Sequence, residues 1–177
     1  MNSGYDVFAR GMHWLMAVLI LGLLALGLYM DDLPLTPAKL QLMSWHKWAG
    51  VSVFLLVLLR LAWRATHRPP AFPSTMSRPV RALAHTAHLS LYALMVAIPL
   101  SGWLMSSAKG FQTVWFGVLP IPDLVGPNAR LGDFMQTVHW ALNMALIALL
   151  VGHVAAVLWH HFILKDGTLG RMTGELS

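Results

Sequence analysis

The sequence predicts an all-α membrane protein, built as one bundle of four transmembrane helices. Of its 177 residues, 57% are hydrophobic and only 11% are charged, whereas a soluble domain carries about 25% charged residues. The apolar residues fall into four runs, and each is long enough to cross a bilayer, which takes about 20 residues of helix. Nothing in the composition separates a second domain, so residues 1–177 are expected to form a single one.

The four apolar runs give the bounds of the expected helices. They cover about residues 7–30, 42–65, 80–107 and 134–164. Pro99 lies inside the third helix and is expected to kink it, because proline removes a backbone hydrogen-bond donor. In the long last connection we expect a short helix at about residues 111–119, lying in the membrane interface. The proline-rich connection at residues 65–79 should be extended rather than helical.

Charge sets the expected orientation and excludes some functions. Most lysines and arginines lie at the end that holds both termini and the connection at residues 65–79, so the positive-inside rule puts that end in the cytoplasm. The pI near 10.1 reflects these loops, and no nucleic-acid partner is expected. The chain has no cysteine, which excludes disulfides, iron–sulfur clusters and thiol-attached haem.

Histidines inside the predicted helices are the main candidates for a functional site. His139 and His153 are two heptads apart, so both rings leave nearly the same helix face, about 21 Å apart along the axis. An imidazole at membrane depth is costly unless something binds it. With the expected orientation, His46 lies at the depth of His139 near the outer surface, and His13 lies at the depth of His153 near the inner surface.

Two histidines at one depth can fill both axial positions of a b-type haem that only carries electrons. The sequence therefore predicts two stacked haems, with His46 and His139 at the outer iron and His13 and His153 at the inner iron. The alternative is that these histidines only form hydrogen bonds within the bundle. It is the weaker interpretation, because the four histidines fall at two matched depths. Zinc is disfavoured because it prefers ligands clustered at one level.

Three other histidines bear on the inner site. His85 and His88 share a face at the start of the third helix, so either could replace His13 or His153 as a ligand, or bond a haem propionate. His160 follows His153 on the same face, about 10 Å nearer the cytoplasm. There it could hydrogen-bond and protonate a quinone head group.

Four segments of the chain resemble the bacterial cytochrome b561 family. In chain order they read YDVFARGMHWLMA, SWHKWAG, LAHTAHLSLYALMVAIPLSG and VHWALNMALIALLVGHVAAVLWHHFILKDGTLGRM. These segments cover parts of all four predicted helices. The chain most resembles the short, freestanding members of the family, which act as superoxide:ubiquinone oxidoreductases. The resemblance implies haem ligands at the same histidines, His13, His46, His139 and His153.

The resemblance also implies an activity, that of a superoxide oxidase in the bacterial inner membrane. Periplasmic superoxide would be oxidised to oxygen, and the electrons would pass through two b haems to ubiquinone. The basic and acidic residues of the outer loops balance, so steering of superoxide would need a local patch, for which Lys47 is the candidate. Gly11, Trp14 and His160 are the expected quinone site at the inner haem edge.

Two expectations stay open beside this one. Haem propionates could be bound by Lys47 and Arg130 on the outer side. On the inner side, Arg10, Arg81 or Lys165 could bind propionates or lipid head groups. The chain could also be an electron-transfer subunit that relays electrons between a partner dehydrogenase or hydrogenase and the quinone pool. Membrane lipid is an expected partner in either case, and the sequence identifies no protein partner.

Overall fold

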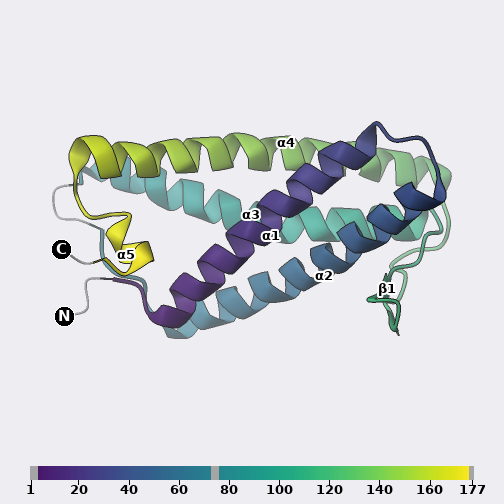
Figure 1. Cartoon of the computed structure of the whole chain (residues 1–177), viewed down its shortest axis with the longest axis horizontal. Coiled ribbons are helices and arrows are strands. Elements are labelled where there is room, and N and C mark those ends of the chain that lie inside the picture. The colour runs from purple at the N-terminus through teal and green to yellow at the C-terminus, as the bar shows by residue number, and fades with distance from the viewer. Residues whose placement is uncertain (1–3, 73–75, 176–177) are drawn as a thin grey trace.

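Four long helices run side by side along the molecule, as the sequence predicts (Figure 1). The computed structural model describes residues 4–72 and 76–175. The elements in chain order are α1 (Val7–Asp31), α2 (Pro37–Thr66), α3 (Arg78–Ala108), β1 (Val114–Trp115), β2 (Leu119–Pro120), α4 (Ala129–Trp159), the π-helix η1 (His160–Leu164) and α5 (Gly170–Thr173). Because η1 directly extends α4, the fourth helical segment reaches Leu164, where the sequence places its end.

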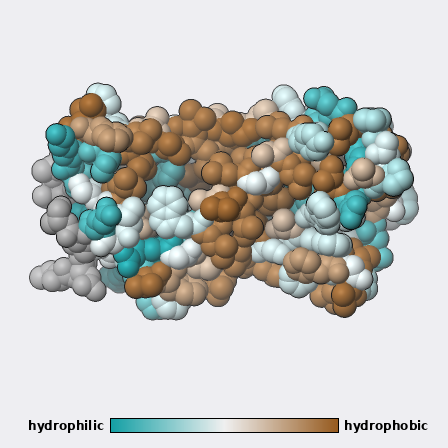
Figure 2. All heavy atoms as spheres, viewed as in Figure 1, coloured by the Kyte–Doolittle hydropathy of each residue, from teal (hydrophilic) through white to brown (hydrophobic). Residues whose placement is uncertain are grey.

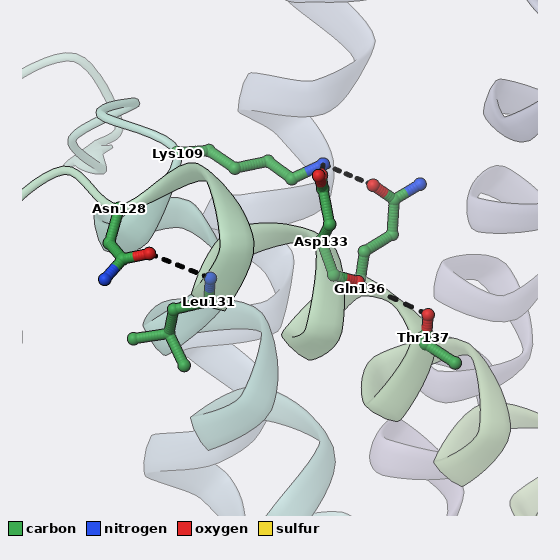
Figure 3. A network of polar contacts seen from close by, with 6 residues as sticks. All are labelled: Lys109, Asn128, Leu131, Asp133, Gln136 and Thr137. Carbon is green, nitrogen blue, oxygen red and sulfur yellow. Dashed lines mark hydrogen bonds and ion pairs between the residues drawn. The ribbon is translucent and has the colours of Figure 1, made fainter.

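α2 and α4 begin earlier than the apolar runs because short polar residues cap them. The Thr36 side chain accepts a hydrogen bond from the backbone N–H of Lys39 at 3.3 Å, and Pro37 follows as the first residue of α2. Asn128 caps α4 in the same way, accepting from the N–H of Leu131 at 3.0 Å (Figure 3). Such caps satisfy N–H groups that have no partner within the helix. They start α2 and α4 about five residues before the predicted bounds.

The bundle consists of two helix pairs. α1 packs on α2 and α3 packs on α4, while α2 and α3 make a smaller contact. The buried cluster of the first pair contains Met12 and Met16 of α1 and Val53 and Val57 of α2. α1 and α2 therefore form one packed unit and α3 and α4 another, and α4 faces α1 and α2 across the bundle (Figure 1).

Most of the apolar surface of the helices points outward. In each long helix no more than 11% of the most apolar 18-residue stretch is buried inside the protein. Figure 2 shows apolar side chains over the middle of the molecule and hydrophilic ones gathered towards its two ends. Helices of this length and composition, apolar on their outer faces, are suited to lipid rather than water. The chain is therefore an integral membrane protein with four candidate spans.

The two ends of the bundle differ in what covers them. The start of α1 and the short α5 lie at one end, which we call the terminus end (Figure 1). β1 and β2 lie at the opposite end, which we call the hairpin end. The connection between α2 and α3, at the terminus end, is neither helix nor strand at residues 67–72 and 76–77, as predicted, and residues 73–75 lie outside the described part of the chain. Residues 65–66 and 78–79, which the prediction also made extended, belong instead to the ends of α2 and α3.

The prediction of a short interfacial helix at residues 111–119 is wrong. This segment forms a small hairpin in which Val114 pairs with Pro120 and Trp115 with Leu119. Phe116 and Gly117 have φ values of 49° and 72°, which suit a tight hairpin turn and not a helix. The β-branched and aromatic residues beside Gly117 were the sequence signal for a strand pair.

The hairpin is held on α2 by two tryptophans. Trp48 donates from Nε1 to the carbonyl of Val114 at 2.5 Å, and Trp115 donates from Nε1 to the carbonyl of Trp48 at 3.2 Å. The Trp115 nitrogen is also 3.3 Å from the hydroxyl of Ser52. These contacts join segments more than 60 residues apart in the chain, so local pattern alone could not predict them.

Candidate functional site

The four histidines singled out from the sequence lie as two pairs, one near each end of the bundle. The ring centroids of His46 on α2 and His139 on α4 are 6.4 Å apart, with an angle of 80° between the rings. Those of His13 on α1 and His153 on α4 are also 6.4 Å apart, at 60°. α4 thus contributes one ring to each pair, and the first helix pair supplies the partner.

The separation within each pair leaves room for one metal atom. A metal about 2.0 Å from a nitrogen of each imidazole requires ring centroids roughly 6 Å apart. Within residues 4–72 and 76–175, no cluster of three or more histidine or carboxylate side chains suited to a metal is present. Two imidazoles would fill opposite positions of a metal and leave the rest to a ligand that is not protein, as the four porphyrin nitrogens do in haem.

At the hairpin end, hydrogen bonds orient the His139 ring. Its Nδ1 lies 3.1 Å from the carbonyl oxygen of Ile98 and 2.9 Å from the hydroxyl oxygen of Ser101. Ser101 donates its own hydrogen to Ile98 at 2.7 Å, so its oxygen is free to accept from Nδ1–H. This arrangement places the ring hydrogen on Nδ1 and leaves the Nε2 lone pair available to a metal.

The partner ring, His46, is closely packed, and one of its nitrogen atoms makes no hydrogen bond within the described part of the chain. Its Nδ1 is buried and has no hydrogen-bond partner in the described part of the chain, which is costly for a polar group. A Cβ atom at Gly27 would lie 3.4 Å from Cε1 of His46, and one at Gly102 would lie 3.1 Å from Cε1 of His139. Gly102 therefore makes room for the His139 ring, while the contact at Gly27 is an ordinary one. This end of the bundle fits a bis-histidine haem.

The terminus end holds a third ring. The centroid of His88 on α3 is 5.6 Å from that of His153, at 66°. The Arg60 guanidinium lies 3.2 Å from Nδ1 of His13 and, since arginine only donates, it places the ring hydrogen on Nε2. Metal binding through Nε2 of His13 would require Arg60 to release the ring. His13 and His88 thus both remain candidates as the partner of His153, and the 6.4 Å separation favours His13.

The predicted quinone residues are spread along the rim of the terminus end. Trp14 donates from Nε1 to the carbonyl of Met172 at 3.1 Å, and Nδ1 of His160 lies 2.5 Å from a carboxylate oxygen of Asp166. Both therefore bond to the C-terminal segment, residues 165–175, and not to each other. Gly11 is exposed, and a Cβ there would meet nothing within 4 Å.

The contacts of the C-terminal segment with Trp14 and His160 were not predicted from the sequence. The segment folds back onto the bundle, where the carbonyl of Arg171 accepts from the N–H of Tyr5 at 3.2 Å. Within it, burial alone would raise the pKa of Asp166, but hydrogen bonds from Thr168 and His160 outweigh burial and hold that pKa below its usual value. Gly167, with φ of 73°, was the available signal for the turn.

At the hairpin end, Lys47 is a fixed cation next to a candidate ligand. Its Nζ donates to the hydroxyl of Ser106 and to the carbonyl of Phe111, both at 2.9 Å. It lines a pocket of about 210 Å³ between α2 and the hairpin. The charge of Lys109, by contrast, is offset by Asp133 at 3.3 Å, with Gln136 alongside (Figure 3).

Comparison with known proteins points to one family. Residues 4–175 match the model of the family described as prokaryotic cytochrome b561. The chain is 34% identical over 174 residues to cytochrome b561 homolog 2 of Escherichia coli (strain K12), across 98% of this chain and 93% of that one. It is 29% identical over 177 residues to a protein of Yersinia pestis named probable superoxide oxidase CybB, across 97% of each. Cytochrome b561 homolog 1 of Escherichia coli (strain K12) is 33% identical over 132 residues, 72% of each chain.

Proposed function

We propose that this chain, which belongs to the prokaryotic cytochrome b561 family, is a superoxide oxidase that passes electrons to ubiquinone. Membership of the family makes it a membrane electron-transfer protein with b-type haem. The proposal adds that two haems are bound and that the substrates are superoxide and ubiquinone. The pair of 6.4 Å histidine separations, one near each end of the bundle, supports the two haems, and the name of the Yersinia pestis relative, probable superoxide oxidase CybB, supports the substrate.

In this proposal each end of the bundle holds one haem. His46 and His139 would hold a haem at the hairpin end, and His13 and His153 would hold one at the terminus end. A bound b haem supplies one-electron exchange between ferric and ferrous iron. Because two imidazoles would hold each haem, oxygen would be kept from binding the iron. Two such sites match a one-electron donor to a two-electron acceptor: two superoxide anions, one ubiquinone and two protons give two oxygen molecules and one ubiquinol.

Superoxide would be oxidised at the hairpin end, which faces the periplasm in the proposed orientation with both termini in the cytoplasm of the bacterium. An anionic substrate is attracted by a local positive charge. Lys47 provides one beside His46, and it lines the pocket between α2 and the hairpin. The amino group of Lys47 is already hydrogen-bonded to Ser106 and Phe111. Lys47 would therefore attract superoxide by its charge at close range, without moving to bind it.

Ubiquinone would be reduced at the terminus end, where Gly11, Trp14 and His160 lie on the rim. The His160–Asp166 hydrogen bond supports a role for His160 in moving a proton, because a carboxylate on Nδ1 orients the ring and leaves Nε2 to face a head group. The open space at Gly11 leaves room for a flat head group against α1.

The second candidate is an electron-transfer subunit for a partner dehydrogenase or hydrogenase. It rests on the family, which makes the chain a membrane electron-transfer protein without specifying a substrate. An assay on the purified chain alone distinguishes the superoxide oxidase from the electron-transfer subunit. Superoxide generated enzymatically should reduce the haems within seconds, and superoxide dismutase should abolish this reduction. Haems that stay oxidised in the presence of superoxide would leave the electron-transfer subunit as the better account.

A further inference from the structure

Two arginines lie inside the bundle at the terminus end, and no carboxylate among residues 4–72 and 76–175 pairs with them. Arg60 and Arg64 are one turn apart on α2, and their guanidinium carbons lie 5.7 Å and 5.6 Å from the ring centroid of Tyr92. Both side chains are half-buried. The ion pairs found in the described part of the chain lie elsewhere, at Lys109–Asp133 and at His160–Asp166.

This placement is unfavourable for the protein alone. Arg60 lies about 9 Å inside the end of α2 at Thr66, at a helical rise of ~1.5 Å per residue. A cation within a membrane span is costly unless it is paired, and like charges four residues apart on a helix repel each other. Contact with the face of one tyrosine offsets only part of this cost. The two guanidiniums therefore call for an anion that the described residues do not supply.

We propose that Arg60, Arg64 and Tyr92 form a carboxylate-binding site that holds the carboxylates of a haem at the terminus end. This inference rests on the proposed function, because it takes a haem to be bound by His153 and its partner ring. A guanidinium matches a carboxylate with two parallel hydrogen bonds. A b-type haem carries two carboxylates along one edge, so the number of arginines suits the ligand.

The position of the arginines agrees with this ligand. Arg60 contacts His13 at 3.2 Å and so lies at the level of the candidate ligand, while Arg64 lies about 6 Å nearer the terminus end by helical rise. A carboxylate at Arg60 would also draw its guanidinium off Nδ1 of His13, which metal binding by that ring requires. The sequence suggested Arg10, Arg81 or Lys165 for this role, and the proposal assigns it to Arg60 and Arg64 instead.

The test compares the rate at which the purified, haem-loaded chain loses haem to an excess of apomyoglobin. In the double variant Arg60→Met, Arg64→Met, one of the two haems should dissociate at least about tenfold faster. The loss of a single charge-assisted hydrogen bond is enough for a change of that size in the dissociation rate. The other haem should leave at the wild-type rate. Changing both arginines to lysine keeps the charge and should give an intermediate rate. Arg68→Met, an exposed position in the connection after α2, is the matched control and should leave both rates unchanged.

A second readout is the midpoint potential of the faster-leaving haem. It should fall in the methionine variant and recover towards the wild-type value in the lysine variant, since a nearby cation favours the reduced form. Running the transfer in lipid-free detergent and in nanodiscs of anionic phospholipid identifies the anion. A haem carboxylate predicts the same difference between wild type and variant in both, whereas a difference seen only with phospholipid would assign the arginines to lipid phosphate and overturn the proposal.

Failure of the proposed function and failure of the carboxylate-binding site would give different results. A wild-type chain that purifies without two haems contradicts the proposed function. A wild-type chain with two haems, beside a double variant with unchanged rates and potentials, contradicts only the carboxylate site.

Discussion

Gly102→Ala tests how closely the bundle is built around the hairpin-end histidines. The new methyl group would lie 3.1 Å from Cε1 and 3.3 Å from Nδ1 of His139, closer than ordinary van der Waals contact. The His139 ring cannot yield freely, because its Nδ1 is held by Ile98 and Ser101. Overpacking of this kind costs about 1–3 kcal/mol, and loss of the hydrogen bond to Ile98 about 1 kcal/mol more.

These magnitudes predict a graded series of haem retention. Gly102→Ala should weaken retention of one haem about tenfold or more, since each ~1.4 kcal/mol is a factor of ten. Gly27→Ala meets His46 at 3.4 Å, an ordinary contact, and should have a small effect. Gly50→Ala meets nothing within 4 Å and serves as the control.

The assay is haem content per purified chain, together with the low-spin spectrum of each haem. A Gly102→Ala protein with the wild-type content and spectrum would refute the reasoning. So would an equal loss of haem in Gly50→Ala, because that position has no ring to displace.

Four further predictions address the histidine ligands, Lys47 and the C-terminal segment. His139→Ala should remove one haem and spare the other, and two intact haems would show that the pairing is wrong. At the terminus end, His13→Ala should abolish a haem that His88→Ala retains, as judged by haem stoichiometry; the reverse result would make His88 the ligand. Lys47→Met should slow superoxide-driven haem reduction and weaken its dependence on ionic strength, without changing haem content; an unchanged salt dependence would exclude steering. Because the pKa of Asp166 is lowered on folding, its ionised form stabilises the fold at neutral pH, and this contribution is lost as pH falls through the lowered pKa. Asp166→Asn should therefore cost about 1 kcal/mol at pH 7 and remove this acid-induced loss, measured by thermal unfolding; equal unfolding temperatures at pH 7 would contradict it.

The helices and the histidine pairs were predictable because their signals are local. An apolar run specifies a span wherever it stands, and two heptads on α4 fix the relative direction of His139 and His153. Depth in the membrane then limits the partners to rings at the same level. His46 and His13 could be chosen on that basis before any packing was known.

The remaining features depend on contacts between distant segments. The hairpin at Val114–Pro120 is held by tryptophan hydrogen bonds to α2, and an isolated two-stranded hairpin is marginal without such support. The fold-back that joins Trp14 to Met172 spans nearly the whole chain. Whether Arg60 meets His13 or solvent is decided by how α2 packs on α1, which no local pattern encodes.

The central claim is that electrons pass from superoxide to ubiquinone through this one chain. The most direct measurement is ubiquinol formation by the purified protein in liposomes that contain ubiquinone, with superoxide supplied outside. We predict about one ubiquinol for every two superoxide anions consumed, as the electron balance requires, and no ubiquinol when superoxide dismutase is added. Ubiquinol formation no faster than in liposomes without the protein would contradict the claim.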